Sequence, residues 1–400
     1  MKAEKQTLST KVYALIVIGV LVGAAIGFGL GAAVYVPQIN SLNSKVKLQS
    51  SLVTLASNSP FAVGAAGTLT YAFGSVLTAF EEQYPSITVA PPLFEGSGLV
   101  ASTENTTKQF SLEAAADTTA MPSALFPKIA NYEIAFGQTQ IVIIVNLQSS
   151  AGTELYSLWK SAQGLTEMST RWNQTWKQMF ALIALNSSSI VGISNPFTDP
   201  SGYQAAGMIR LAGLTFFGNM SKLYDAIYDN SSRIAAQTLY ITNTETDLVP
   251  LVQTDHIDFI LSAYKSNAIP QTGNSTQTGL AYITLPTAVN LGVLSDLSYY
   301  HLANFSLSSA NFSLDTSSTP TPFVVDPVIY CVTIPIPSTN AAAANLFIQT
   351  LFNKTGQSIL EQYGITPLLP GIVYGNYTSV PSPIQLLTTQ VNATYSSLFP

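Results

Sequence analysis

The stretch NPFTDPSGY, residues 195–203, contains the chemistry of a helix start. Asp199 has a side chain suited to an N-cap, Pro200 suits the first helical position, and a helix-length run follows over residues 201–214. The free backbone N–H groups at such a start can bind an anion without help from a lysine. Simple helix capping, with no ligand, explains the same residues equally well.

Outward from this helix, short β-rich runs alternate with helical ones. Residues 86–89 predict a strand, and three apolar runs predict buried strands at 141–145, 257–261 and 328–334. Residues 150–255 are mostly helical in pattern. This alternation predicts an α/β fold with a largely parallel sheet, and strands that cross between two lobes fit the order.

Composition and charge exclude several classes of protein. The chain has 400 residues, 47% of them apolar and 9% charged, which is enough for a membrane segment and two ordinary domains. Residues 60–400 carry 20 acidic and 10 basic side chains, so a basic surface for nucleic acid is excluded. The low charge, with abundant Ser, Thr, Asn and Gln, suits an acidic exterior in which carboxylates are neutral.

Few residues are available for metal or thiol chemistry. Cys331 is the single cysteine, and His256 and His301 are the only histidines, so neither disulfides nor a Cys/His metal centre is expected. Cys331 lies in an apolar run and is predicted to be a buried, unreactive thiol.

The N-terminus predicts a membrane anchor. Residues 12–36 are 25 consecutive residues without a charge, more than the roughly 20 that a helix needs to span a bilayer. The positive-inside rule places the lysine-containing leader, residues 1–11, in the cytoplasm and the rest of the chain outside the cell membrane. Residues 37–61 then form a stalk or linker. A cleaved signal peptide is the alternative to a single-pass anchor.

Because the chain is expected outside the cell membrane, its eleven Asn-X-Ser/Thr sequons are candidate acceptors for N-glycosylation. The candidate asparagines are Asn105, Asn173, Asn186, Asn219, Asn230, Asn274, Asn304, Asn311, Asn353, Asn376 and Asn392. The sequence therefore predicts a glycoprotein, although sequons also arise by chance in a chain rich in Ser, Thr and Asn.

The motif at residues 195–203 resembles the archaeal tungstate/molybdate-binding proteins of ABC transporters. Further blocks resemble that family in the same order: AGTL at 66–69, EGS at 95–97, LFPK at 125–128, TETDL at 244–248, YKS at 264–266, DPVIY at 326–330 and a closing helix at 345–364. DPSGY and ETDL are the most specific of them. The resemblance extends over residues 62–370 and implies an extracellular solute-binding protein.

The fold implied by the resemblance is a two-lobed, type II periplasmic-binding-protein-like α/β fold, preceded here by one transmembrane helix. The expected boundaries are residues 62–142 and 268–385 for lobe 1, 143–267 for lobe 2, and 386–400 for a C-terminal tail.

The resemblance also assigns residues that contact the oxygen atoms of the ligand. Thr68 and Ser97 stand where the family has serines that bind the oxyanion. Tyr203 either donates a hydrogen bond to the ligand or packs between the lobes. Near residues 117–120 the chain is one residue shorter than the family pattern, which leaves one ligand contact open.

Asp199 and Glu245 match an Asp and a Glu that, in the family, bind the metal centre of tungstate or molybdate and complete its octahedral coordination. Sulfur and phosphorus have no comparable ability to add two ligands, so the same carboxylates mainly repel sulfate and phosphate. Taken without the resemblance, Glu245 reads as an exposed residue in the first turn of a helix.

These expectations predict capture of tungstate or molybdate in an interlobe cleft and delivery to an ABC permease with a separate ATPase, without a cofactor. A solute-binding protein for sulfate, phosphate or an organic solute is one alternative, and a glycosylated, surface-anchored structural or interaction protein is another. An enzyme is not expected, because KTG at residues 354–356 precedes YGN at 374–376, the reverse of their order in penicillin-binding serine enzymes.

Overall fold

The computed structural model describes residues 47–229, 231–273, 275–308 and 319–400. The predicted leader and transmembrane segment, residues 1–36, lie outside the described residues, as do residues 37–46 of the stalk. Residues 47–55 are helical. In the described ranges, no helix combines the length and the hydrophobicity that crossing a membrane requires.

The first lobe is built on a seven-stranded sheet with the strand order β14-β13-β4-β12-β3-β1-β2. Its strands are β1 (Val63–Ala66), β2 (Leu93–Glu95), β3 (Leu112–Ala115), β4 (Tyr132–Gln138), β12 (Ile329–Thr333), β13 (Thr366–Gly375) and β14 (Thr388–Gln390). β12 runs antiparallel to both of its neighbours, β3 and β4, because it returns from the second lobe. The sheet is therefore mixed, whereas the alternation of elements predicted a largely parallel one.

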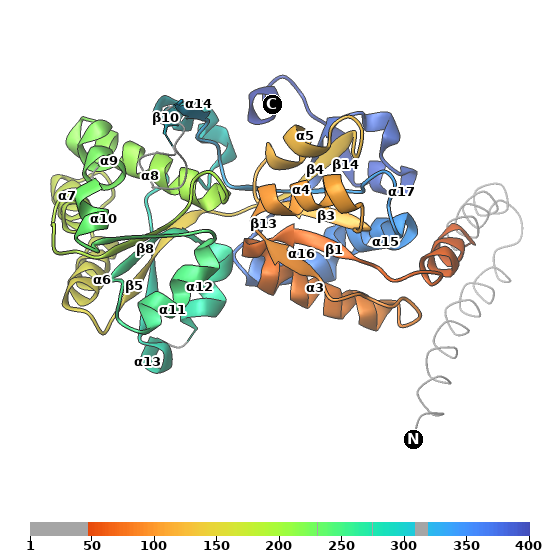
Figure 1. Ribbon diagram of the computed structural model, residues 1–400, viewed down its shortest axis with the longest axis horizontal. Helices are drawn as coiled ribbons and strands as arrows, with labels where there is room; N and C mark the ends of the chain where they lie inside the picture. Colours follow the sequence, from red (N-terminus) through yellow and green to blue (C-terminus); the bar gives the residue numbers. More distant parts are fainter. Residues whose placement is uncertain (1–46, 230, 274, 309–318) are drawn as a thin grey trace, which may run out of the picture. The chain divides into compact units, whose positions relative to one another are not determined.

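Helices cover both faces of this sheet (Figure 1). They are η1 (Gly67–Leu69), α3 (Thr70–Gln83), α4 (Ser97–Thr107), α5 (Ala120–Leu125), α15 (Ala341–Phe352), α16 (Lys354–Gln362), η6 (Tyr377–Ser379), α17 (Ser382–Gln385) and η7 (Ser396–Leu398). On one face, Phe73 of α3 packs against Phe136 of β4 and Phe347 of α15. On the other face, Cys331 is fully buried in an apolar cluster that includes residues of α4 and α5.

The second lobe contains a five-stranded sheet with the strand order β7-β6-β8-β5-β9. Its strands are β5 (Ile141–Asn146), β6 (Val191–Ser194), β7 (Leu239–Thr242), β8 (Phe259–Tyr264) and β9 (Leu280–Thr284). Because β9 pairs with β5, this sheet continues to residue 284, whereas the sequence analysis ended lobe 2 at residue 267. β9 is a short edge strand with the sequence LAYIT, and the sequence analysis did not predict it.

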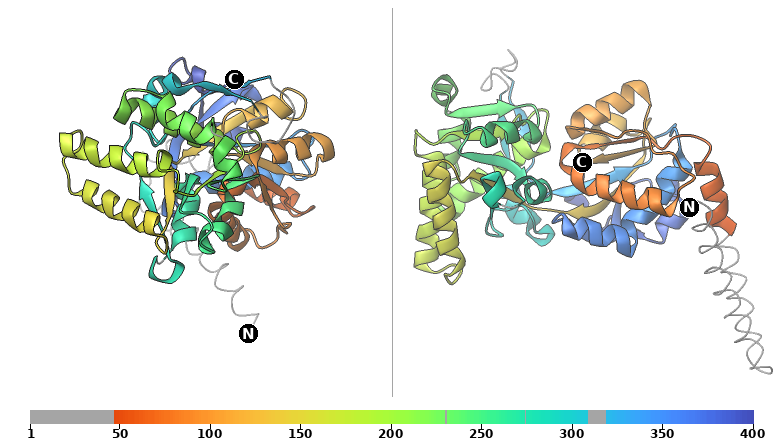
Figure 2. Two further views of the ribbon diagram at one scale, coloured as in Figure 1. Left: turned by 60° about the vertical axis from the view of Figure 1, so that its left-hand side comes forward. Right: turned by 90° about the horizontal axis from the view of Figure 1, so that it is seen from below.

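Helices surround the second sheet, as the two views of Figure 2 show. They are α6 (Ser150–Gln163), α7 (Thr170–Ala184), α8 (Pro200–Phe217), α9 (Ser221–Tyr228), α10 (Ser231–Ala235), η2 (Glu245–Asp247), α11 (Leu248–Gln253), α12 (Lys265–Thr272) and α13 (Ser275–Thr278). The predicted helix start is confirmed: the Asp199 side chain caps α8 by accepting from the Ser201 N–H at 3.0 Å, and Pro200 is the first helical residue.

The chain passes between the lobes at residues 139–140 and returns through residues 285–328. The described elements of the returning segment are η3 (Leu294–Asp296), α14 (Leu297–Tyr300), η4 (His301–Ala303), β10 (Phe305–Leu307) and β11 (Thr321–Phe323). The strands predicted at 141–145 and 328–334 are confirmed as β5 and β12. The strand predicted at 257–261 is confirmed as β8, which begins two residues later than predicted. The strand predicted at 86–89 is wrong, because only Val89 pairs, in an isolated bridge with Phe61.

The limits of the folded part differ from the predicted ones at both ends. Ala56 and Phe61 are fully buried, so the folded part begins inside the segment assigned to the stalk. At the other end, β14 pairs with β13, which brings residues 388–390 of the predicted tail into the first lobe.

The predicted glycosylation sites lie at the surface wherever the structure describes them. Asn105, Asn186, Asn219, Asn304, Asn376 and Asn392 are exposed, and Asn173 and Asn353 are half-buried. Asn230, Asn274 and Asn311 lie outside the described residues. The six exposed asparagines are therefore accessible to sugar attachment in the folded protein, whereas the Nδ2 atom of Asn173 donates a hydrogen bond to the Met168 carbonyl oxygen.

Candidate functional site

Two short segments from different lobes meet at the centre of the candidate site. η1 of the first lobe carries Thr68, and η2 of the second lobe carries Glu245; the two residues are 2% and 4% exposed. A Cβ added to Gly67 would lie 3.6 Å from Glu245 Oε1, so the Glu245 carboxyl group reaches the η1 backbone. The lobes are therefore in contact where η1 and η2 meet, at Gly67 and Glu245.

The Thr68 hydroxyl group is the most informative single atom of the site. Its Oγ1 is buried and has no hydrogen-bond partner among the described residues. Leaving a buried hydroxyl unpaired costs about 1–3 kcal/mol, so native proteins rarely do it without a reason. An oxygen atom of a bound ligand would satisfy it, which is the role predicted for Thr68.

Asp199 connects the start of α8 to Glu245. Its Oδ1 accepts from Ser201 N–H, and its Oδ2 accepts from Glu245 N–H at 2.9 Å. The capping interpretation of Asp199 is therefore correct, but capping uses only one of its two oxygens. The other oxygen orders the loop that carries the second carboxyl group of the site.

The electrostatics of the pair are those of two buried like charges. Burial raises the pKa of Glu245 well above its usual value, and the negative charge of the neighbouring Asp199 raises this pKa further. The Glu245 Oε1 atom accepts a 2.8 Å hydrogen bond from Asn267 Nδ2. No lysine or arginine is among the predicted site residues, so none of them offsets the negative charge that these carboxyl groups carry when ionised.

Ser97 approaches the same region from the first lobe. It is the first residue of α4 and is 1% exposed, and its Oγ accepts from the Ala116 N–H at 3.0 Å. Accepting that bond leaves the hydroxyl hydrogen free to be donated. The preceding residue, Gly96, touches the second lobe so closely that an added Cβ would lie 2.5 Å from the Thr198 carbonyl oxygen.

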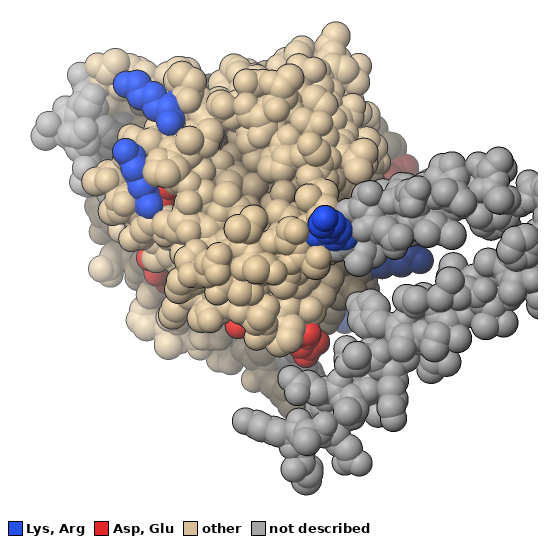
Figure 3. All heavy atoms as spheres, turned by 90° about the vertical axis from the view of Figure 1, so that its right-hand side faces the viewer, with Lys and Arg blue, Asp and Glu red and all other residues tan. Residues whose placement is uncertain are grey.

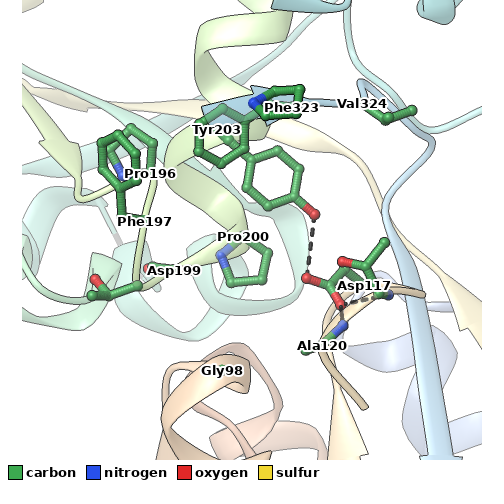
Figure 4. Close-up of a pocket in the computed structure, with 13 residues that line it drawn as sticks. Gly98, Asp117, Ala120, Pro196, Phe197, Asp199, Pro200, Tyr203, Phe323 and Val324 are labelled. Atoms are coloured by element: carbon green, nitrogen blue, oxygen red, sulfur yellow. Dashed lines mark hydrogen bonds between the residues drawn. The ribbon is translucent and has the colours of Figure 1, made fainter. Parts of the chain in front are cut away.

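Tyr203 has a different position from the other predicted residues. Its hydroxyl group donates to Asp117 Oδ2 across the lobes at 3.2 Å, and its ring stacks on Phe323 of β11 with centroids 5.4 Å apart. Asp117 is held in turn by the N–H groups of Thr119 and Ala120 (Figure 4). Tyr203 therefore connects the two lobes in this structure, and its contact with the ligand stays a prediction.

A cavity of about 310 Å³ lies beside Asp199, between the lobes (Figure 4). Its lining includes Gly98 and Asp117 from the first lobe, Phe197 and Tyr203 from the second, and Phe323 from the returning segment. Thr68, Ser97 and Glu245 do not line it. The structure thus brings Thr68, Asp199 and Glu245 into one buried group and places Tyr203 on a more open, aromatic cavity.

Three site residues were not predicted from the sequence. Asn267 lies beside the YKS block, so its position in the resemblance was the available signal. Asp117 lies in the segment 117–120, where the chain is one residue shorter than the family pattern, and that difference was the available signal. Phe323 had no local signal, because its role depends on stacking with a ring 120 positions away in the chain.

A resident metal centre of the usual kind is not formed by the residues that the structure describes. In those ranges, no group of three or more His, Cys, Asp or Glu side chains could hold a metal ion. Hydroxyl and N–H donors beside two carboxyl groups are instead suited to a ligand that presents oxygens on its outside and an electron-accepting atom at its centre.

Two lobes with a buried polar site between them are the architecture of periplasmic-binding-protein-like folds. The chain belongs to the bacterial extracellular solute-binding protein family, which it matches over residues 61–366. It is therefore the solute-binding component of an ABC transporter, an extracellular protein that works with a permease and is not an enzyme.

Relatives include two molybdate/tungstate-binding proteins named WtpA. That of Pyrococcus abyssi is 26% identical over 297 residues, which cover 70% of this chain and 76% of the relative. That of Thermococcus kodakarensis is also 26% identical over 297 residues, covering 70% and 74%. Among solved structures, the sulfate-binding protein SubI from Mycobacterium tuberculosis H37Rv is 12% identical, with a TM-score of 0.49 and coverage of 86% of this chain and 92% of its own.

Proposed function

We propose that this chain captures tungstate or molybdate between its lobes and delivers it to an ABC permease driven by a separate ATPase. The observation that carries the proposal is the pair of buried carboxyl groups, Asp199 and Glu245, joined through the bond from Glu245 N–H to Asp199 Oδ2. A high-valent metal centre can accept two carboxylate ligands, whereas the sulfur of sulfate and the phosphorus of phosphate cannot. The names of the two WtpA relatives support the same assignment.

The other residues take roles that follow from their hydrogen-bonding capacity. The unpaired Thr68 hydroxyl group and the free hydrogen of the Ser97 hydroxyl group donate to ligand oxygens. N–H groups at the starts of α4 and α8 add fixed dipoles. Tyr203 reaches the ligand only if it leaves Asp117, so its contribution here is to hold the lobes together.

A larger solute is a second candidate, favoured by the aromatic cavity beside Asp199. Its volume of about 310 Å³ lies at the lower end of the range typical of sites for small organic molecules. Phe197, Tyr203 and Phe323 provide apolar contact area, and Asp117 provides a polar group. An organic solute would use this cavity and leave the Thr68 hydroxyl group unsatisfied.

The experiment is isothermal titration calorimetry on the full chain in detergent micelles, with tungstate, molybdate, sulfate and phosphate as ligands. Asp199→Asn and Glu245→Gln are expected to weaken tungstate binding at least tenfold, about 1.4 kcal/mol, and to leave sulfate binding unchanged or improved. Asp247→Asn is the matched control, because Asp247 is exposed and lies two residues after Glu245. Equal losses for tungstate and sulfate would refute carboxylate coordination of the metal centre.

The attachment to the cell is also a proposal. We infer from the uncharged run at residues 12–36 that the chain is tethered to the cell membrane by a single helix, with the folded part outside and glycosylated. Mass spectrometry of the native protein tests both parts. It detects residues 1–36 if the anchor is kept, and it finds glycans on the exposed sequons if the surface is modified.

A further inference from the structure

The first lobe buries three glutamates on one face of its sheet. Glu113 lies on β3, Glu133 on β4 and Glu104 on α4, and they are 1%, 0% and 0% exposed. Glu113 pairs with Thr333 of β12, and the antiparallel register of β12 with β4 brings Glu133 to the other side of Thr333. The helix α4 that carries Glu104 packs on β1 and β3. The three carboxyl groups therefore share the interior between the sheet and the helices α4 and α5.

These carboxyl groups have almost no partners. Glu104 Oε2 accepts from Phe110 N–H at 2.9 Å, but Glu104 Oε1 and both oxygens of Glu113 and of Glu133 have no hydrogen-bond partner in the described part of the chain. An ionised carboxylate buried without a cation or donors costs several kcal/mol, even after the protein relaxes. A neutral carboxyl group avoids most of that cost.

Of the surrounding groups, only Lys108 offsets a negative charge: it lowers the pKa of Glu104, by less than burial raises it. On the elements packed around the three glutamates, the other titratable groups are Glu95 on β2, Lys108 at the end of α4, Asp117 before α5, Tyr132 on β4, Tyr330 and Cys331 on β12 and Tyr374 on β13. Lys108 is the only base among them, and its side chain is exposed. Burial raises the pKa of all three glutamates; Glu104 raises the pKa of Glu113 further, and Asp117 and Glu113 raise that of Glu133.

The surface provides an independent observation. Among the described residues there is one ion pair, between His301 Nε2 and Asp326 Oδ1 at 2.7 Å. Figure 3 shows that uncharged residues make up most of one face, with few charged groups among them. A surface that does not depend on ion pairs loses little when its carboxylates become protonated.

We propose that the first lobe folds around three protonated glutamates, so that folding takes up about three protons and the extracellular part is most stable in an acidic medium. The unfolded chain holds these protons only below its ordinary glutamate pKa, near 4.3, whereas the folded chain keeps them to higher pH. The stabilisation is thus complete below about pH 4 and is lost as the pH rises through the folded pKa values. Within that interval each group raises the unfolding equilibrium constant about tenfold per pH unit.

Urea denaturation of the full chain in detergent micelles, followed by circular dichroism between pH 4 and pH 8, tests the proposal. From pH 5 upward the unfolding constant is expected to rise by up to about a thousandfold per pH unit, ten for each of three protons. The triple variant Glu104→Gln, Glu113→Gln, Glu133→Gln imitates the protonated form, so its slope is expected to lose the contribution of three protons and to keep that of Glu245, whose pKa is also raised by burial, and its stability at pH 7 is expected to exceed that of the natural chain. Glu81→Gln, Glu82→Gln, Glu361→Gln, a matched triple of exposed glutamates in the same lobe, keeps the natural slope.

A second measurement needs no variant, so it tests the proposal even if the triple variant does not fold. Infrared difference spectroscopy of the natural chain at pH 7, with and without unfolding, detects the carbonyl stretch of protonated carboxyl groups directly. The proposal requires that band in the folded protein and its disappearance on unfolding. Absence of the band, a natural chain that is equally stable at pH 5 and pH 7, or a triple variant that keeps the natural slope would each overturn it.

Discussion

Substitution of Gly96 tests whether the contact between the lobes seen in this structure is also present when a ligand is bound. Its backbone, with φ −58° and ψ 138°, is a conformation that alanine adopts freely, so Gly96→Ala places no strain on the first lobe itself. The added Cβ would, however, lie 2.5 Å from the Thr198 carbonyl oxygen of the second lobe. An ordinary contact begins at about 3.4 Å, so the lobes must move apart by close to 1 Å at this point.

The expected effect follows from the energy of overpacking. Forcing one methyl group into a packed contact costs about 1–3 kcal/mol, and here the cost falls on the closed form alone, because the lobes can open at the crossing segments. Tungstate affinity should therefore fall about 5- to 150-fold, mostly through faster dissociation. The melting temperature of the unliganded protein should stay the same, because the open form has no clash.

Gly74 supplies the matched control, in α3 of the same lobe. A Cβ at Gly74 would have no neighbour within 4 Å, so Gly74→Ala should keep the natural affinity and gain helix propensity of up to about 1 kcal/mol. Stopped-flow measurement of tungstate release, together with calorimetry, gives both quantities. If Gly96→Ala binds and releases tungstate as the natural chain does, the contact between Gly96 and Thr198 is absent from the liganded form and the reasoning fails.

Two further substitutions separate binding from stability. Thr68→Val removes the unpaired buried hydroxyl group at constant shape, so it should raise the melting temperature of the unliganded protein while lowering anion affinity at least tenfold; a loss of both stability and affinity would contradict a ligand-binding role for Oγ1. Tyr203→Phe removes the hydrogen bond to Asp117, which at about 0.5–1.5 kcal/mol should speed anion release two- to tenfold; release at the natural rate would show that this bond does not hold the lobes closed.

The elements that the sequence predicts well are those whose cause is local. The start of α8 is determined by two adjacent residues: Asp199 caps the helix and Pro200 is its first residue. The strands β5 and β12 are continuous apolar runs because both of their faces are buried. At residues 86–89 a β-rich run predicted a strand that does not form. Pro91 and Pro92 follow it and cannot donate backbone hydrogen bonds, so regular pairing begins only at β2.

The parts of the site that escaped prediction depend on contacts distant in the chain. Asn267 donates to Glu245 from 22 positions away, and Phe323 stacks on Tyr203 from 120 positions away, so no spacing rule connects them. The extent of the second lobe was misjudged for a related reason: β9 belongs to it through pairing with β5, which lies about 140 residues earlier. The partners of a side chain are a property of the fold, whereas its capping chemistry is a property of its neighbours.

An anion site without basic residues and a lobe built on neutral carboxyl groups are consistent with the same environment. Residues 60–400 carry a net charge of about −10 when all carboxyl groups are ionised, and that field repels any anion. In an acidic medium the exposed carboxylates lose charge and the repulsion weakens, while the Thr68 and Ser97 hydroxyl groups and the helix N–H groups are unchanged. Donors that do not titrate are therefore the ones that such a protein can use at every pH at which its first lobe is stable.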